Sequence, residues 1–319
     1  EELAASLWGA DYARFSTGGS THANQAIILA LGKPGDKVAI TRTAHRSVLS
    51  ALVLTGLEPI WLTPDIDEAT GVPIGIPVSE LERVLDQKPI ALLLTEPGYL
   101  GTISELPALI LKAHENSIPV IVDAAWGGHF GFNSDIPAHV MQLGADALIT
   151  SVHKALPGYS ASALFLAQGK FLNLARIEQS FVTTHTTSPA GAPLASIDGC
   201  RALLQTRGEQ LTGALLKYVQ DFKNAVQSHF DTAIFLNPSD FVAGRFDPVK
   251  IVLRANLLGL SGVDVEKQLQ KANIRVEMAD RDTIVFLATL ADDAADFAAL
   301  ADALIPILKS LQGTPRATQ

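Results

Sequence analysis

The sequence has 319 residues, 48% of them hydrophobic and 18% charged, which is enough apolar material for one large core and a smaller one. Lys and Arg number 24 against 33 Asp and Glu, and this net charge of -9 is opposite in sign to the basic footprint of nucleic-acid binders. The single cysteine, Cys200, excludes an intrachain disulfide framework and a cysteine-based zinc cluster, and it favours the cytoplasm. No apolar run approaches the roughly 18 residues of a membrane helix, so we expect no nucleic acid, membrane or metal partner.

Short apolar runs alternate with helical segments between residues 37 and 151. The runs are KVAIT (37–41), EPIWLT (58–63), IALLLT (90–95), IPVIVD (118–123) and ADALIT (145–150). Runs of this length separated by helices predict a mainly parallel sheet that is covered on both faces. Ligands of such sheets bind beyond the carboxyl ends of the strands. Polar residues follow the runs at 41–45, 95–99, 123–129 and 151–154.

The rest of the sequence changes character after a helical stretch around residues 208–229. From about residue 230, short strand-like runs alternate with one helix near 262–272 and a final alanine-rich helix that ends near 311. This pattern is typical of a small α+β domain that follows a large α/β domain. We therefore predict an α/β protein with a large domain over residues 1–229 and a small domain over residues 230–319.

Glycines and hydroxyl residues stand directly before the first apolar helix, as Gly18, Gly19, Ser20 and Thr21. Free N–H groups at a helix start favour an anion, glycines let the backbone approach it closely, and hydroxyls donate to its oxygens. The segment is therefore a candidate phosphate cradle. It has neither the Walker pattern nor the dinucleotide glycine pattern, and an ordinary loop with a Ser/Thr cap explains it as well.

Several residues at strand ends have side chains suited to a flat ring that contains a nitrogen. Asp123 can hold a protonated ring nitrogen by a charge-assisted hydrogen bond, or it can cap a turn. Ala125 offers a small, flat surface beside it. His45 can stack on a ring or be a half-exposed histidine at a helix start. Trp126 and His129 are more typical of packing and loop roles.

Lys154 follows a buried run in the segment SVHK. Burial lowers the pKa of a lysine and frees its amine as a nucleophile, as a Schiff-base lysine requires, although a lysine can also extend to the surface. Ser151 and His153 could approach a phosphate from the side opposite to Ser20. A phosphate cradle, a stacking ring, an aspartate and an imine-forming lysine are together what pyridoxal phosphate needs.

Five segments of the sequence also resemble successive motifs of the Orn/Lys/Arg decarboxylase family, the pyridoxal-phosphate enzymes of fold type I. The segments are GGSTHANQAIILAL, GDKVAITRTAHRSV, VDAAWGGHFGF, SVHKALPG and TTSPAGAPLASID. Residues 265–290 resemble the small C-terminal domain of the family. The resemblance implies the fold of PLP-dependent transferases, pyridoxal 5'-phosphate as cofactor, and decarboxylation of lysine, ornithine or arginine to an amine, as in polyamine biosynthesis.

The resemblance also implies roles for individual residues. Lys154 forms the Schiff base, Asp123 meets the pyridine nitrogen, and His45 stacks on the pyridine ring. Lys154, Asp123 and His153 are the expected catalytic residues. The residues expected to bind the cofactor are Gly19, Ser20, Thr21, His45, Asp123, Ala125, Ser151, His153 and Lys154.

Two features depart from the family pattern. Ala190 and Gly191 follow TTSP where an aromatic residue is common, and the DAAW segment with Trp126 replaces a commoner Asp-Glu-Ala-His form. Both concern substrate preference more than cofactor binding. We expect the family's N-terminal segment to be missing from this sequence. We also expect a homodimer in which the TTHTTSP segment lies near the phosphate of the partner.

A basic substrate needs a carboxylate for its distal cation. Glu277, in the predicted small domain, is the candidate by its position, unless it is an exposed strand residue; Glu96 and Asp135 are lesser candidates. The same cofactor also serves aminotransferases and lyases, and an inactive regulatory homologue is the non-enzyme alternative. An assay for the products would distinguish these functions by the release of carbon dioxide, the formation of a keto acid or the absence of turnover.

Overall fold

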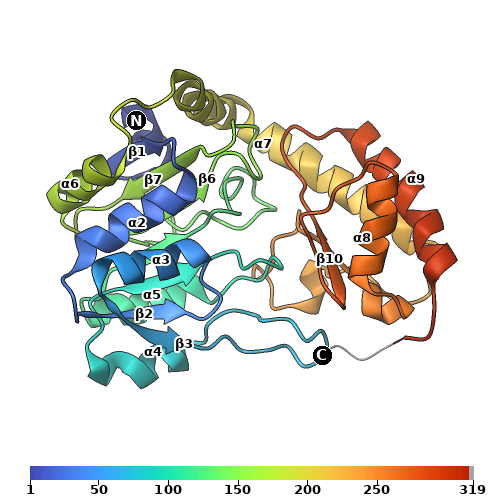
Figure 1. The fold of residues 1–319 in the computed structure, drawn as a ribbon, viewed down its shortest axis with the longest axis horizontal. Coiled ribbons are helices and arrows are strands. Elements are labelled where there is room, and N and C mark those ends of the chain that lie inside the picture. Colours follow the sequence, from blue (N-terminus) through green and yellow to red (C-terminus); the bar gives the residue numbers. More distant parts are fainter. Residues whose placement is uncertain (316–319) are drawn as a thin grey trace.

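A computed structural model describes residues 1–315, and its larger sheet has seven strands in the order β1-β7-β6-β5-β4-β2-β3 (Figure 1). These strands are β1 (Tyr12–Ser16), β2 (Lys37–Thr41), β3 (Glu58–Leu62), β4 (Leu92–Thr95), β5 (Val120–Asp123), β6 (Ala147–Ser151) and β7 (Ala163–Ala167). Strands β2 to β6 pair in parallel, whereas β7 is antiparallel to both of its neighbours, β6 and β1. The prediction of a mainly parallel sheet is confirmed.

Two hydrophobic clusters cover the two faces of the large sheet. Successive side chains of a strand point to opposite faces, so Leu92 and Leu94 belong to one cluster and Leu93 to the other. Helices α2, α3 and α6 pack on the face of Leu93, and α4 and α5 on the opposite face. Their bounds are α2 (Gly19–Leu31), α3 (Arg46–Thr55), α4 (Val78–Val84), α5 (Leu106–Glu115) and α6 (Leu174–Thr184).

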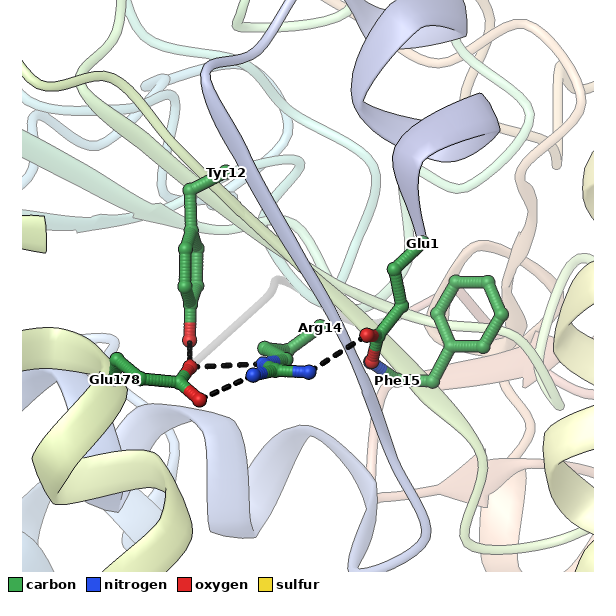
Figure 2. Close-up of polar contacts among 5 residues, drawn as sticks. All are labelled: Glu1, Tyr12, Arg14, Phe15 and Glu178. Atoms are coloured by element: carbon green, nitrogen blue, oxygen red, sulfur yellow. Dashed lines mark hydrogen bonds and ion pairs between the residues drawn. The ribbon is translucent and has the colours of Figure 1, made fainter.

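Edge strand β1 is held by a network of charged side chains (Figure 2). The hydroxyl group of Tyr12 donates to Oε2 of Glu178 on α6 over 2.9 Å, and Nε of Arg14 donates to the same oxygen over 2.8 Å. Arg14 also pairs with Glu1, and the backbone N–H of Phe15 donates to Glu1 Oε1 over 3.0 Å. Glu1 precedes α1 (Glu2–Trp8), so the network joins the start of the chain to the sheet edge.

Helix α7 (Gly191–Gln227) leads from the large sheet to the C-terminal part, where α8 (Gly262–Lys271) and α9 (Ala294–Leu311) accompany a second sheet (Figure 1). That antiparallel sheet has the order β8-β10-β9, with β8 (Ile251–Arg254), β9 (Met278–Ala279) and β10 (Thr283–Phe286). Short 3-10 helices are η1 (Leu85–Gln87), η2 (Pro238–Asp240) and η3 (Ala255–Leu258). The α+β character of this part agrees with the prediction.

The C-terminal part also differs in detail from the prediction. The run at 232–236 contributes only an isolated bridge between Phe235 and Leu253 in place of a full strand. One buried cluster runs from the large sheet through α7 to the smaller sheet, so the division of the chain at residue 230 stays a proposal. Residues 316–319 of the predicted small domain lie outside the described residues. Within residues 1–315, no helix is both long and apolar enough to cross a membrane.

Candidate active site

A pocket of about 380 Å³ lies beyond the carboxyl ends of β4, β5 and β6. Its lining includes all nine residues that we expected to bind a cofactor: Gly19, Ser20, Thr21, His45, Asp123, Ala125, Ser151, His153 and Lys154. They come from the start of α2, the start of α3 and the ends of β5 and β6. Parallel strands bring these segments together because their carboxyl ends meet at one edge of the sheet.

One end of the pocket is suited to an anion. Helix α2 begins without a side-chain cap, which leaves the N–H groups of Ser20 and Thr21 available. Ser20 Oγ lies 2.8 Å from Ser151 Oγ, so hydroxyl groups of α2 and β6 meet there. Gly19 has a φ of +69°, a conformation that glycine adopts without strain, and its N–H donates to the carbonyl of Ala161 over 2.7 Å. The predicted cradle is therefore assembled from two separate segments.

His153 borders the same end of the pocket. Its Nδ1 atom lies 2.9 Å from the carbonyl oxygen of Ser162. Because a carbonyl oxygen only accepts, Nδ1 must carry a proton, and a neutral His153 then has Nε2 as an acceptor. His153 can therefore donate a hydrogen bond through Nε2 only when its ring is protonated.

Asp123 is buried at the end of β5 and is held by two donors. Nδ2 of Asn24 donates to Oδ2 over 2.7 Å, and the backbone N–H of Ala125 donates to Oδ1 over 3.1 Å. Burial raises the pKa of Asp123, whereas these donors and the nearby cations of Lys154 and His45 oppose the rise. The carboxylate is thus prepared to meet a positively charged donor.

Asn24 was missed in the sequence analysis. The signal for it was a polar amide within an otherwise apolar helix, where a buried amide requires partners. Its Nδ2 atom also donates to Ser47 Oγ over 3.1 Å, which connects α2 to the start of α3.

His45 caps helix α3 and lines the pocket. Its Nδ1 atom accepts from the backbone N–H of Ser47 over 3.2 Å. Burial lowers the pKa of His45, although Asp123 opposes this effect. His45 is therefore a histidine at a helix start whose planar ring also borders the pocket, and its stacking on a cofactor stays a prediction.

Lys154 is half-buried where β6 ends. Burial lowers the pKa of its amine, while Asp123 and Glu277 act in the opposite direction. Its Nζ atom lies 4.2 Å from the ring centroid of Trp126, which also lines the pocket. Trp126 is thus both a packing residue and a wall of the site. A lysine with a lowered pKa has more of the nucleophilic amine form.

Among the carboxylates proposed for a distal cation, Glu277 has a direct connection to the pocket. It is an exposed residue just before β9 and does not line the pocket itself. Its Oε1 atom accepts a hydrogen bond of 2.7 Å from the hydroxyl group of Tyr99, a lining residue. Glu96 borders a smaller neighbouring cavity and is bound to Ser104, and Asp135 is exposed and absent from the lining of both cavities.

Comparison with known proteins identifies relatives of this chain. A family model described as "Orn/Lys/Arg decarboxylase, major domain" matches residues 1–244. The arginine decarboxylase of Bacillus subtilis (strain 168) is 33% identical over 318 residues, which cover 98% of this chain and 64% of that protein. The arginine decarboxylase of Bacillus cereus is 33% identical over 322 residues, covering 99% of this chain and 69% of that protein. This chain therefore spans about two thirds of the length of these relatives.

Solved structures with the same fold include lysine decarboxylase A from Pseudomonas aeruginosa, with a TM-score of 0.83 at 20% identity over 97% of this chain and 50% of that one. The ureidoglycine-glyoxylate aminotransferase of Bacillus subtilis has a TM-score of 0.76 at 15% identity over 99% of this chain and 85% of that one. The prediction of fold type I is confirmed by these likenesses, which at such identities concern the fold alone.

Proposed function

The chain belongs to the Orn/Lys/Arg decarboxylase family, and from this premise we propose that it decarboxylates a basic amino acid with pyridoxal phosphate as its cofactor. The observation that carries the proposal is the meeting of Lys154, Asp123 and the uncapped start of α2 in one pocket. The substrate is lysine, ornithine or arginine, and the product is the corresponding amine.

The residues of the pocket fit the cofactor in two respects. Ser20, Thr21 and Ser151 provide hydroxyl groups for a phosphate at the uncapped start of α2. His45 and Ala125 supply small or planar surfaces for a ring. Pyridoxal phosphate bound here would accept the electrons released when the bond between Cα and the carboxylate breaks.

The side chains of the chain have distinct tasks in this proposal. The Asp123 carboxylate, supported by Asn24, would hold a proton on the ring nitrogen of the cofactor. The Lys154 amine would hold the cofactor covalently. Nζ of Lys154 or the ring of His153 would supply the proton that replaces the lost carboxylate at Cα.

Glu277 is proposed to bind the distal ammonium or guanidinium group of the substrate. Tyr99 holds its carboxylate close to the pocket, and the same carboxylate attracts Lys154. Glu277→Gln preserves shape and removes the charge, so we expect KM for the preferred basic amino acid to rise about tenfold or more. The absorbance of the bound cofactor should stay unchanged.

The test compares carbon dioxide release by this chain from lysine, ornithine, arginine and one neutral amino acid. Added pyridoxal phosphate should give an absorbance band near the visible edge that is lost in Lys154→Ala. An unchanged band in that variant would defeat the assignment of Lys154, and a preference for the neutral amino acid would defeat the assignment of the substrate class.

The same cofactor and fold also serve aminotransferases and lyases, so the fold does not select which bond breaks. A keto-acid product in place of carbon dioxide would favour an aminotransferase. An inactive regulatory homologue would bind the cofactor without turnover. The presence of Lys154 and Asp123 in one pocket favours an enzyme.

We also propose that the whole protein is a cytoplasmic homodimer whose TTHTTSP segment approaches the phosphate site of the partner. Residues 186–191 are exposed in the single chain, which leaves them free for such a contact. His185, at the start of this exposed stretch, accepts a hydrogen bond of 3.2 Å from the N–H of Thr17, next to the glycines of the cradle. Solution scattering that found a fully active monomer would exclude the dimer.

A further inference from the structure

A second lysine lies behind the wall of the pocket, and the functions proposed above do not use it. Lys250 is 6% exposed, and its Nζ atom is buried without a hydrogen-bond partner. The other deeply buried lysine, Lys223, donates from Nζ to the carbonyl oxygen of Leu236 over 3.0 Å. A buried ammonium group without a partner lowers stability, so its position calls for a functional explanation.

The fold holds the backbone of Lys250 against the loops of the large sheet. The N–H of Asp247 donates to the carbonyl of Gly101 over 2.8 Å, and Asp247 Oδ1 lies 3.1 Å from Nε2 of buried His129. The N–H of Lys250 donates to the carbonyl of Asp247 over 3.0 Å. A Cβ atom at Gly101 would lie 2.8 Å from Cγ of Lys250, so this approach of the two segments requires glycine.

The ammonium group of Lys250 lies against Trp126, a residue of the pocket lining. Its Nζ atom lies 3.9 Å from the ring centroid of Trp126 and 5.4 Å from that of Tyr99. Nζ of Lys154 lies 4.2 Å from the same Trp126 centroid. Two lysines therefore share one indole ring, and their Nζ atoms can be at most about 8 Å apart.

We propose that Lys250 is a positioning residue, which holds the Trp126 ring in the pocket wall by a cation–π contact and keeps a second positive charge near Lys154. This inference rests on the proposed function, in which Lys154 must react as a free amine. It explains why an ammonium group is kept in a buried place without a hydrogen bond.

The charged groups around both lysines determine how Lys250 affects the protonation of Lys154. Asp123, Glu277 and His45 face Lys154, and Asp247, Glu277 and Lys154 itself face Lys250. Burial lowers the pKa of Lys250 to about 8, so at pH 7 it is mostly protonated. While Lys250 is protonated, its like charge disfavours the protonated form of Lys154 and thus increases the amine fraction of Lys154 at pH 7. Above about pH 8 Lys250 loses its charge and this effect ends.

Lys250→Met tests the proposal because it keeps the apolar length of the side chain and removes the charge. The rate of acetylation of Lys154 by limiting acetic anhydride is measured against pH in the cofactor-free chain, by mass spectrometry of the peptide that contains Lys154. We expect the rate at pH 7, where Lys250 is charged, to fall about tenfold, as the interaction of two charges across a partly buried site implies. Lys250→Arg keeps the charge and should leave the rate at pH 7 near that of the native chain.

A purely structural role predicts different results. A lysine that serves only packing would leave the acetylation rate of Lys154 at pH 7 unchanged when its charge is removed. Lys223→Met is the matched control, since it changes a similarly buried lysine and should leave the Lys154 profile unchanged. An unchanged rate at pH 7 in Lys250→Met, or an equal fall in Lys223→Met, would overturn the proposal. If Lys250→Met does not fold, a clearly lower rate at pH 7 in Lys250→Arg would overturn it.

The labelling experiment does not depend on cofactor chemistry. If the native chain forms no bond with pyridoxal phosphate, the proposed function fails while the labelling profile still reports on Lys250. If the native chain forms this bond but Lys250→Met leaves the acetylation rate of Lys154 at pH 7 unchanged, only the role of Lys250 is lost.

Discussion

Replacement of Asn24 by alanine tests whether helix α2 supports the charge of Asp123. Asn24 is buried, and its Nδ2 atom donates to Oδ2 of Asp123 over 2.7 Å. A hydrogen bond to a charged group contributes about 1.5–3 kcal/mol, which corresponds to about one to two units in the pKa of the carboxyl group. The N–H of Ala125, 3.1 Å from Oδ1, remains as the other donor.

The sign of the effect follows from the burial of Asp123. Burial raises its pKa above the usual 3.8, and Asn24 opposes that rise. An acid with a raised pKa in the folded chain contributes stability below its unfolded pKa, and this contribution is lost as the pH rises through the folded pKa. Without Asn24 the folded pKa rises further. Asn24→Ala should therefore lower the free energy of unfolding by about 1.5–3 kcal/mol more at about pH 8 than at about pH 4.

Urea unfolding of the cofactor-free chain, followed by circular dichroism at the two pH values, measures this difference. Asp123→Asn provides the control background, because it keeps the shape of the side chain and removes its charge. In that background, Asn24→Ala should reduce stability equally at both pH values. The reasoning would be refuted if Asn24→Ala reduced stability equally at both pH values with Asp123 present.

Three further predictions concern the phosphate end, a buried acid and the edge of the sheet. In absorbance titrations, Ser151→Ala should weaken the binding of pyridoxal phosphate about fivefold and leave the binding of pyridoxal unchanged, because pyridoxal has no phosphate. An equal loss of affinity for both compounds would contradict a role of Ser151 at the phosphate. Burial raises the pKa of Glu96 to about 7. The free energy of unfolding of the native chain should therefore fall by about 3 kcal/mol between pH 4.5 and 7, relative to that of Glu96→Gln. The same pH dependence in both proteins would contradict this. Arg14 lowers the pKa of Glu178, so the stability from this pair is present above pH 4.5 and is lost as the pH falls through the folded pKa. Glu178→Gln should therefore lower the free energy of unfolding at about pH 7 by less than about 1 kcal/mol, as expected for a partly exposed pair. If urea unfolding showed the same loss at about pH 3, it would count against the ion pair.

Much of the fold was predictable because its signals are local. Apolar runs such as 118–123 and 145–150 became strands β5 and β6, since each is short, buried on both faces and bounded by polar residues. Parallel strands bring their carboxyl ends to one edge, and the order of the runs therefore placed Asp123 and Lys154 together. The reversed direction of β7 was not predicted, although the segment between β6 and β7 has no helix to carry a parallel crossover.

The sequence by itself determined which segments form strands and helices and which residues end them, because hydrophobic periodicity and residue chemistry act over a few neighbouring positions. Tertiary structure alone decided the ionic environment of the site. Asn24 meets Asp123 from 99 positions away, and Tyr99 meets Glu277 from 178 positions away. Lys250 lies against Trp126 only because the smaller sheet packs beside the larger one. Burial and the distances between charges set the pKa values of such groups, and both depend on contacts between segments that no local pattern records.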